Sequence, residues 1–132
     1  MDFEIGKTVK HWLDGAAYDL ETGRTLLESR RYPYALFFGH LALEKILKAF
    51  VVKSTQSHAP YTHSLPLLVS KANIEISESV IDQLAEYTEF HLETRYPDER
   101  RDFYQKCTEE FARHKFGEME EIYKWLIRKL GI

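Results

Sequence analysis

The residues from Arg31 to Val52, RYPYALFFGHLALEKILKAFVV, limit most strongly what this chain can fold into. If this stretch is an α-helix, with about 100° of rotation per residue, apolar side chains cover almost its whole circumference. Its polar side chains form only a thin seam, made of His40, Glu44, Lys45 and Lys48. A helix of this kind is buried on more than one side, and a bundle core covers only one of them.

The second side of this helix therefore needs another covering surface. Tyr34, Phe37 and Leu41 lie outside the main apolar half of the helix. We expect them to contact a second copy of the chain, which predicts a homodimer. The alternative is that loops and a short neighbouring helix of the same chain cover them.

The polar seam has two interpretations. His40, Glu44 and Lys48 follow one another at i, i+4 spacing, so Glu44 can pair with Lys48 and accept a hydrogen bond from His40. They form either a half-exposed ion pair, which contributes a few tenths of a kcal/mol, or a charged seam that lines a cleft. The chain lacks the Glu-x-x-His motifs of di-iron bundles. We therefore predict no metal site and no cofactor.

The remaining sequence predicts further helices and no strand. Ser64 and Ser77 are candidate N-caps, Pro66 suits a first helical turn, and Gly131 is a stop signal. The predicted helices cover residues 7–29, 31–53, 65–72, 78–94 and 103–130. Short connections between long helices predict an all-α fold, an antiparallel up-and-down four-helix bundle with an additional short helix. We expect residues 1–132 to form a single domain.

Composition excludes several classes of protein. With 44% hydrophobic residues the chain is not disordered, and a net charge of −3 provides no global basic field for nucleic acid. The lone Cys107 excludes an intrachain disulfide and is best explained as a packing residue. The polar N-terminus does not resemble a signal peptide, and no apolar run is long enough to span a membrane. We expect a soluble, cytoplasmic protein.

The end of helix 78–94 combines buried and charged character. His91 and Arg95 fall within the apolar stripe of this helix, and a guanidinium there needs a partner or access to water. Arg95 either emerges into a cleft or binds the last carbonyls of a helix. Arg100 and Arg101 follow, interrupted by acidic residues, so the segment DERRD could equally be a solvated charged loop.

Several segments, taken in order, resemble one known family. They are WLDGAAYDLETGRTLL, ALFFGHLALEKILKAFVV, YTHSL, ETRYP and an aromatic-rich last helix. The most specific parts are Glu44-Lys45-x-x-Lys48-Ala49, Thr62-His63-x-Leu65 and Arg95-Tyr96-Pro97. In order and spacing the chain resembles the HEPN domain over essentially its whole length.

The resemblance implies an α-helical up-and-down bundle that dimerises and associates with nucleotides or RNA. Some HEPN proteins serve as partners of a small nucleotidyltransferase, often as a toxin–antitoxin pair. Others are metal-independent ribonucleases with an Arg-x4-6-His motif, in which His acts on the ribose 2′-hydroxyl and Arg steadies the phosphate. In this chain no His follows Arg95 at that spacing. A ribonuclease would have to bring in His63 or His91 from elsewhere.

We therefore favour a non-catalytic binding protein that takes a nucleotide or RNA phosphate. The site is expected where the YTHSL turn meets the RYP segment, because the N–H groups at the start of helix 65–72 favour anions. Its predicted residues are His63, Arg95, Tyr96, Lys45, Lys48, Glu44, Arg100 and Arg101. A rival role for Arg95 is to brace the fold by pairing with Glu44. The alternatives for the whole chain are a ribonuclease and a structural helical adaptor without a ligand.

Overall fold

The computed structural model describes residues 3–95 and 97–131, and it describes the side chains of residues 3–91 and 102–131. This part of the chain contains six helices and no strand. The helices are α1 (Ile5–Glu28), α2 (Tyr32–Thr55), α3 (Leu65–Ala72), α4 (Glu78–Arg95), α5 (Pro97–Lys106) and α6 (Glu109–Leu130). The predicted all-α helical bundle is confirmed.

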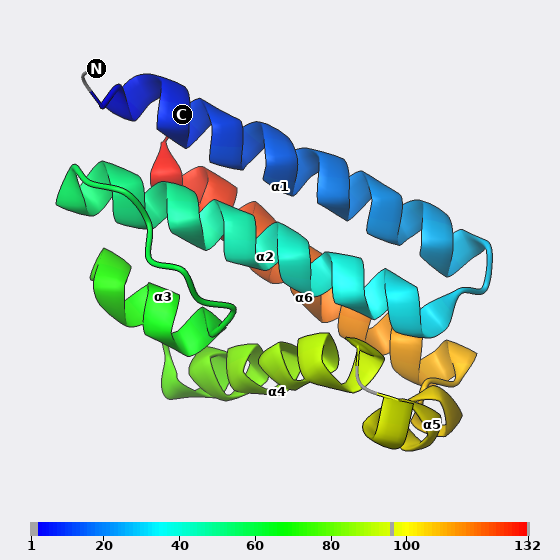
Figure 1. Ribbon diagram of the computed structural model, residues 1–132. Helices are drawn as coiled ribbons and strands as arrows, with labels where there is room; N and C mark the ends of the chain where they lie inside the picture. Colours follow the sequence, from blue (N-terminus) through cyan, green and yellow to red (C-terminus); the bar gives the residue numbers. More distant parts are fainter. Residues whose placement is uncertain (1–2, 96, 132) are drawn as a thin grey trace.

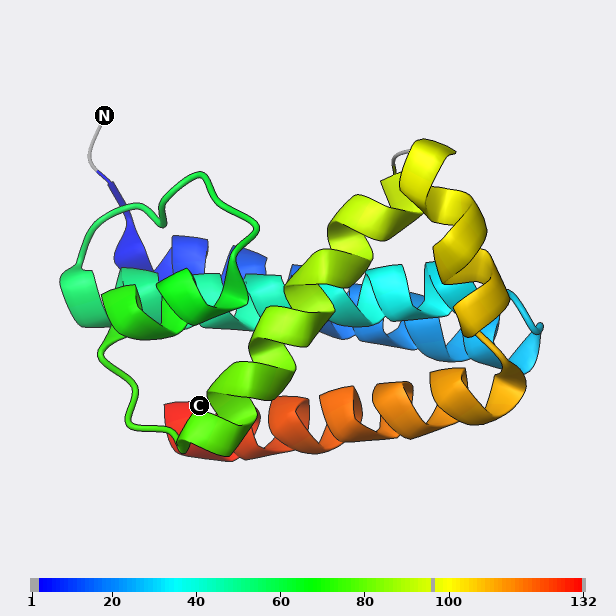
Figure 2. The same cartoon turned by 90° about the horizontal axis from the view of Figure 1, so that it is seen from below.

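The four long helices alternate in direction along the chain (Figure 1). α1 and α2 form an antiparallel hairpin, and α6 lies along α2. α4 crosses the others obliquely, as Figure 2 shows from below. α3 and the loop before it lie over the second half of α2, so the additional short helix covers one end of the bundle.

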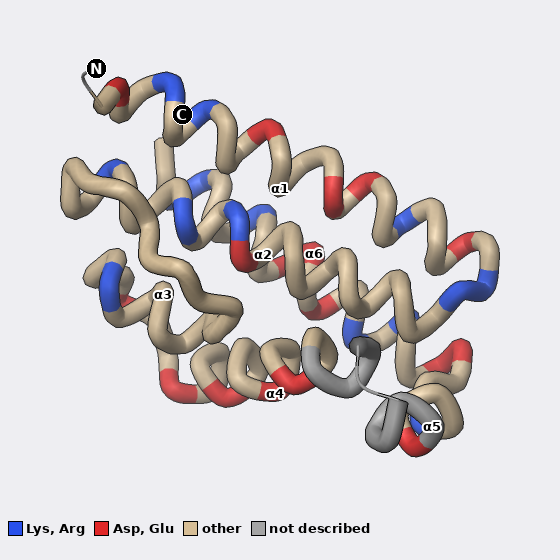
Figure 3. Tube along the Cα trace, in the orientation of Figure 1, with Lys and Arg blue, Asp and Glu red and all other residues tan. Residues whose placement is uncertain are grey.

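The middle of the fold is α2, which contacts each of α1, α3, α4, α5 and α6. Leu36, Leu43, Ile46 and Leu47 of α2 are completely buried. Gly39 lets α6 approach closely, because a Cβ at this position would overlap the sulfur of Met119. Most of the second side of α2 is thus covered by the chain itself. In Figure 3 charges are spread along α1, whereas α2 carries none in its first three turns.

The chain between α4 and α6 differs from the sequence prediction. The break expected over residues 95–102 is short, because α5 begins at Pro97, where a missing N–H does not weaken a helix. The long helix predicted over 103–130 is wrong as a single element, since it is divided at Cys107 and Thr108. The Thr108 hydroxyl accepts a hydrogen bond from the Phe111 N–H and so caps α6.

No helix among the described residues is long and apolar enough to cross a membrane.

Candidate functional site

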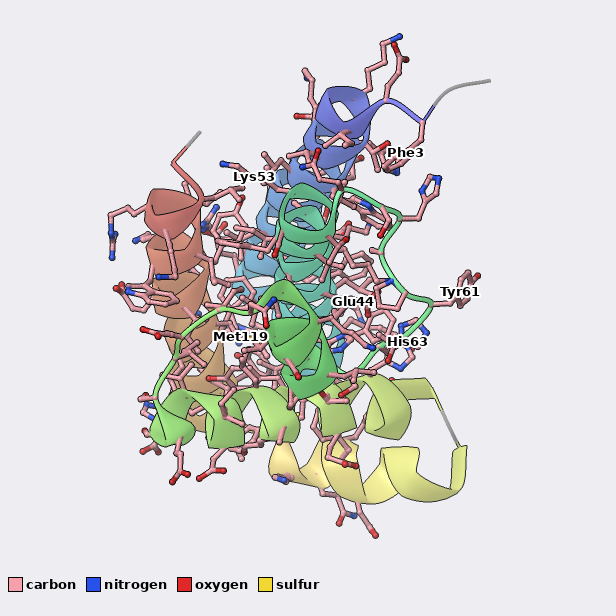
Figure 4. All side chains as sticks on the ribbon, turned by 90° about the vertical axis from the view of Figure 1, so that its left-hand side faces the viewer. Phe3, Glu44, Lys53, Tyr61, His63 and Met119 are labelled. Carbon is pink, nitrogen blue, oxygen red and sulfur yellow. The ribbon has the colours of Figure 1, made fainter. Side chains whose placement is uncertain are left out.

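The polar seam of α2 is buried and paired. His40, Glu44 and Lys48 are 0%, 4% and 8% exposed. Glu44 uses both carboxylate oxygens: Oε1 accepts from His63 Nδ1 at 2.9 Å, and Oε2 accepts from Lys48 Nζ at 3.0 Å. His63 belongs to the loop that precedes α3, so Glu44 ties this loop to the central helix (Figure 4). Of the two sequence interpretations, the half-exposed ion pair is wrong, because the pair is buried.

The His40 side chain holds the same loop by a hydrogen bond to the loop backbone. Its Nε2 lies 3.0 Å from the carbonyl oxygen of His63, which can only accept a hydrogen bond, so Nε2 carries the proton. The other ring nitrogen, Nδ1, is buried and has no hydrogen-bond partner among the described residues. In the neutral ring Nδ1 therefore carries no proton, and no described carboxylate lies within hydrogen-bond distance of it.

Burial affects the pKa of both His40 and Glu44. It lowers the pKa of His40, and this outweighs the His63 carbonyl and the Glu44 carboxylate, which favour the charged ring. Burial alone would raise the pKa of Glu44. The hydrogen bonds from His63 and Lys48 outweigh it, so the pKa of this carboxyl lies below its usual value. At neutral pH the cluster thus contains a carboxylate and a neutral imidazole.

The His63 ring lies at the edge of this cluster. Its side chain is 47% exposed, and the ring stacks on that of His91 from α4 with 4.0 Å between centroids. His91 is itself buried and lies close to Phe37 and His40, with ring centroids 5.4 and 5.2 Å away. Glu44 accepts the Nδ1 proton of His63, so Nε2 is the ring nitrogen that faces away from the carboxylate. Tyr61, two residues earlier, is fully exposed (Figure 4).

The first turn of α3 does not offer its N–H groups to an anion. The Leu65 N–H donates to the Thr88 hydroxyl at 3.2 Å, and Leu67 donates to the hydroxyl of Ser64 at 3.3 Å. Leu68 donates to the Ser64 carbonyl, and Pro66 has no N–H. Ser64 is the predicted N-cap, and that prediction is confirmed. The same caps occupy the donors that we expected to bind an anion, so that part of the expectation is wrong.

The two lysines of α2 have separate partners. Lys48 Nζ lies 5.2 Å from the centroid of the Trp12 ring, in addition to its bond with Glu44. Lys45 lies against α1, where its Nζ is 2.6 Å from Asp19 Oδ2. Lys48 therefore lies beside Glu44 and His63, whereas Lys45 of α2 forms an ion pair with Asp19 of α1.

Four of the predicted site residues, Arg95, Tyr96, Arg100 and Arg101, lie outside the described side chains. The backbone of Arg95 ends α4, one helical turn after His91. His63 of the YTHSL turn stacks on His91, one helical turn before the end of α4; its predicted contact with the RYP segment lies outside the described side chains.

Among the predicted dimer residues, Tyr34 is 42% exposed and its ring lies edge-on to Tyr104 of α5. Phe37 and Leu41 are half-buried. These three side chains are among those of α2 that the described residues of the chain leave partly open.

Sequence reasoning missed two members of the cluster. The sequence places His91 in an apolar stripe and offers it only for a ribonuclease, and Trp12 enters only as part of the segment WLDGAAYDLETGRTLL. Both join the cluster through contacts between helices that are far apart in the sequence. No local spacing reports such contacts.

A metal centre has no support among the described side chains. No three His, Cys, Asp or Glu residues there are grouped so that they could hold a metal ion. The chemistry available to the cluster is hydrogen bonding, proton exchange and ring stacking.

Comparisons with known proteins place the chain in a family. The sequence pattern of the HEPN domain matches residues 9–130, so the chain belongs to the HEPN domain family. The fold is similar to that in the crystal structure of TT1696 from Thermus thermophilus, with a TM-score of 0.76 and 20% identity. That similarity covers 92% of this chain and 97% of TT1696. The search of curated proteins gave no match.

The buried His40 predicts that acid weakens the fold. Its folded pKa lies below that of the unfolded chain, so the unfolded state binds more protons once the pH falls below about 6.5. Stability should be full above this pH and should decrease below it by up to roughly 1.4 kcal/mol per pH unit. Urea unfolding at several values from pH 7.5 to 5.5 measures this slope.

The matched variants are His40→Gln and His114→Gln. Glutamine keeps an N–H donor at position 40 without titrating, so the slope should flatten. His114 is 68% exposed on α6, where it pairs with Glu118, and its replacement should not flatten the slope. Equal slopes in the parent and in His40→Gln would contradict the assignment to His40.

Proposed function

We propose that the chain is a HEPN-type nucleotide- or RNA-associated binding protein that takes a phosphate-bearing ligand at the edge formed by His63 and the end of α4. In this proposal it is the non-catalytic partner of a small nucleotidyltransferase in a module of the toxin–antitoxin type. Co-purification with a nucleotidyltransferase encoded beside it tests the partnership directly. The family membership supports the general role, and the His63 edge is our choice for the site.

The observation that carries the proposal is the fixed orientation of His63. Glu44 holds its Nδ1 at 2.9 Å, His40 holds its carbonyl at 3.0 Å, and His91 stacks on its ring. An imidazole held in this way has a fixed orientation, and its Nε2–H, present when both ring nitrogens carry protons, can donate to a phosphate oxygen without further ordering, which reduces the entropic cost of binding. The exposed Tyr61 ring is available for stacking on a base.

Arg95 completes the proposed site through its position in the chain. It follows His91 by one helical turn, at the end of α4. A guanidinium supplies a planar fork for a phosphate. In the rival role Arg95 braces the fold by pairing with Glu44. Because His63 and Lys48 each donate to one oxygen of Glu44, this carboxylate would remain paired without Arg95.

We expect Arg95→Ala to weaken binding of ATP or of a short single-stranded oligoribonucleotide by roughly tenfold or more. The reason is the loss of a charge-assisted hydrogen bond to phosphate. Its free energy of unfolding should change by less than about 1 kcal/mol, because Glu44 keeps its own partners. Calorimetric titration and urea unfolding measure the two quantities.

Arg113→Ala is the control, since this exposed arginine pairs with Glu109 on α6. It should bind both probes as the parent does. If the parent binds neither probe, or if Arg95→Ala binds them equally well, the ligand site is refuted and a structural adaptor becomes the better interpretation.

A ribonuclease is the second candidate, and one contact favours it. The Glu44–His63 pair has the form of a carboxylate that orients a histidine base, and His91 lies beside it. Against it stands the missing Arg-x4-6-His spacing. We expect the isolated protein not to cleave structured or unstructured RNA efficiently in the presence of a chelator.

Gel electrophoresis of the incubated RNA measures the outcome. Cleavage that disappears in His63→Ala or His91→Ala, but persists in the surface variant His114→Ala, would make the ribonuclease the correct function.

We also propose that the chain forms a homodimer through Tyr34, Phe37 and Leu41 of α2. Phe37→Glu should convert it to a monomer in sedimentation equilibrium at tens of micromolar, because an unpaired carboxylate is costly to desolvate. Tyr34→Glu, at a more exposed position, tests the same face with less risk to the core. Tyr18→Glu, 75% exposed on α1, is the control and should remain dimeric. A monomeric parent would refute the dimer.

A further inference from the structure

A second surface lies away from the His63 loop, on a side of the molecule formed by α4 and α6. It is a hollow of about 390 Å³ between the α3–α4 connection, the first turn of α4 and the second half of α6. We call it the α4–α6 pocket. It is lined by Glu75, Ile76, Ser77, Val80, Glu121, Ile122 and Trp125.

The walls of the α4–α6 pocket are apolar and incompletely covered. Ile76, Val80 and Trp125 pack against the core with part of their surface and remain partly exposed with the rest. Ile122 beneath them is buried. Apolar groups around one hollow gain free energy when a second apolar group displaces the water. Tryptophan is also enriched among residues that dominate protein–protein binding.

The charged residues of the α4–α6 pocket indicate which kind of molecule it can bind. Glu75 and Glu121 are its charged lining residues, and they come from the α3–α4 connection and from α6, two different walls. Lys124 Nζ is 3.9 Å from Glu121, but both side chains are largely exposed, so the carboxylate is weakly neutralised. Lys129 lies over the Trp125 ring at 5.3 Å. Neither lysine is among the residues that line the hollow, so the charge inside it is that of the two carboxylates, which favours a cation next to an apolar group over a phosphate-bearing ligand.

We propose that the α4–α6 pocket is a docking site for a segment of a partner protein that carries a large apolar side chain next to Lys or Arg. The apolar side chain would pack on Trp125 and Ile122, and the basic group would lie between Glu75 and Glu121. A helix presents such a pair when the two residues are three or four positions apart. This site is independent of the proposed ligand site at His63.

Two synthetic helical peptides test the proposal with the full-length, ¹⁵N-labelled protein. Both carry the same leucine face, and one has lysines beside it where the other has glutamates. The lysine peptide should shift the indole N–H resonance of Trp125, which Trp125→Phe identifies among the two tryptophans of the chain. The glutamate peptide should bind at least fivefold more weakly. The double variant Glu75→Gln/Glu121→Gln should weaken binding of the lysine peptide by about fivefold.

Matched controls separate this site from general charge effects and from the His63 site. Glu28→Gln/Glu89→Gln removes two exposed carboxylates elsewhere and should not change peptide binding. His63→Ala should not change it either. Three results would overturn the proposal: the Trp125 resonance does not move, both peptides bind equally well, or the resonance moves with protein concentration alone, which would identify a second copy as the occupant.

Discussion

The position of α2 is the constraint on which the rest of this structure depends. A helix with apolar side chains on nearly all sides must be enclosed, because each exposed face would cost the free energy of hydrating it. The chain encloses it with α1, α3, α4 and α6 and with the loop before α3. Enclosure also buries the polar seam, so a carboxylate in the middle of the molecule must find partners of its own. Glu44 finds them in Lys48 and His63.

This buried pairing links packing to the proposed site. Because Glu44 needs a second donor, the loop before α3 is drawn against α2, and the His63 ring takes one orientation at the surface. His40 strengthens the same connection through the His63 carbonyl. The contacts that satisfy a buried charge are thus the contacts that present a half-exposed imidazole beside His91 and the end of α4. In the proposed function, the ligand meets a group that the fold has already oriented.

The two surfaces are proposed to bind ligands of opposite charge. At the His63 edge the carboxylate of Glu44 is buried and compensated, and Arg95, Arg100 and Arg101 follow in the chain, interrupted by acidic residues. In the α4–α6 pocket the carboxylates of Glu75 and Glu121 line an apolar hollow. Under the two proposals a phosphate-bearing ligand would bind at the first surface, through the guanidinium of Arg95, and a basic protein segment would bind at the second.

The sequence by itself determined the helical class, the capped helix at Leu65–Ala72 and the near-complete burial of α2, because periodicity and caps act within a few residues. It also pointed to His63, Glu44 and Lys48 as one neighbourhood. It did not show the division at Thr108, although a threonine followed by two glutamates is an N-cap signal, because the apolar pattern continues through it. Only the tertiary structure decided that the chain covers most of α2 itself, that Lys45 pairs with Asp19, and that the first-turn donors of α3 are occupied. Those outcomes depend on contacts between residues far apart in the chain, and no local spacing encodes which distant side chain will arrive.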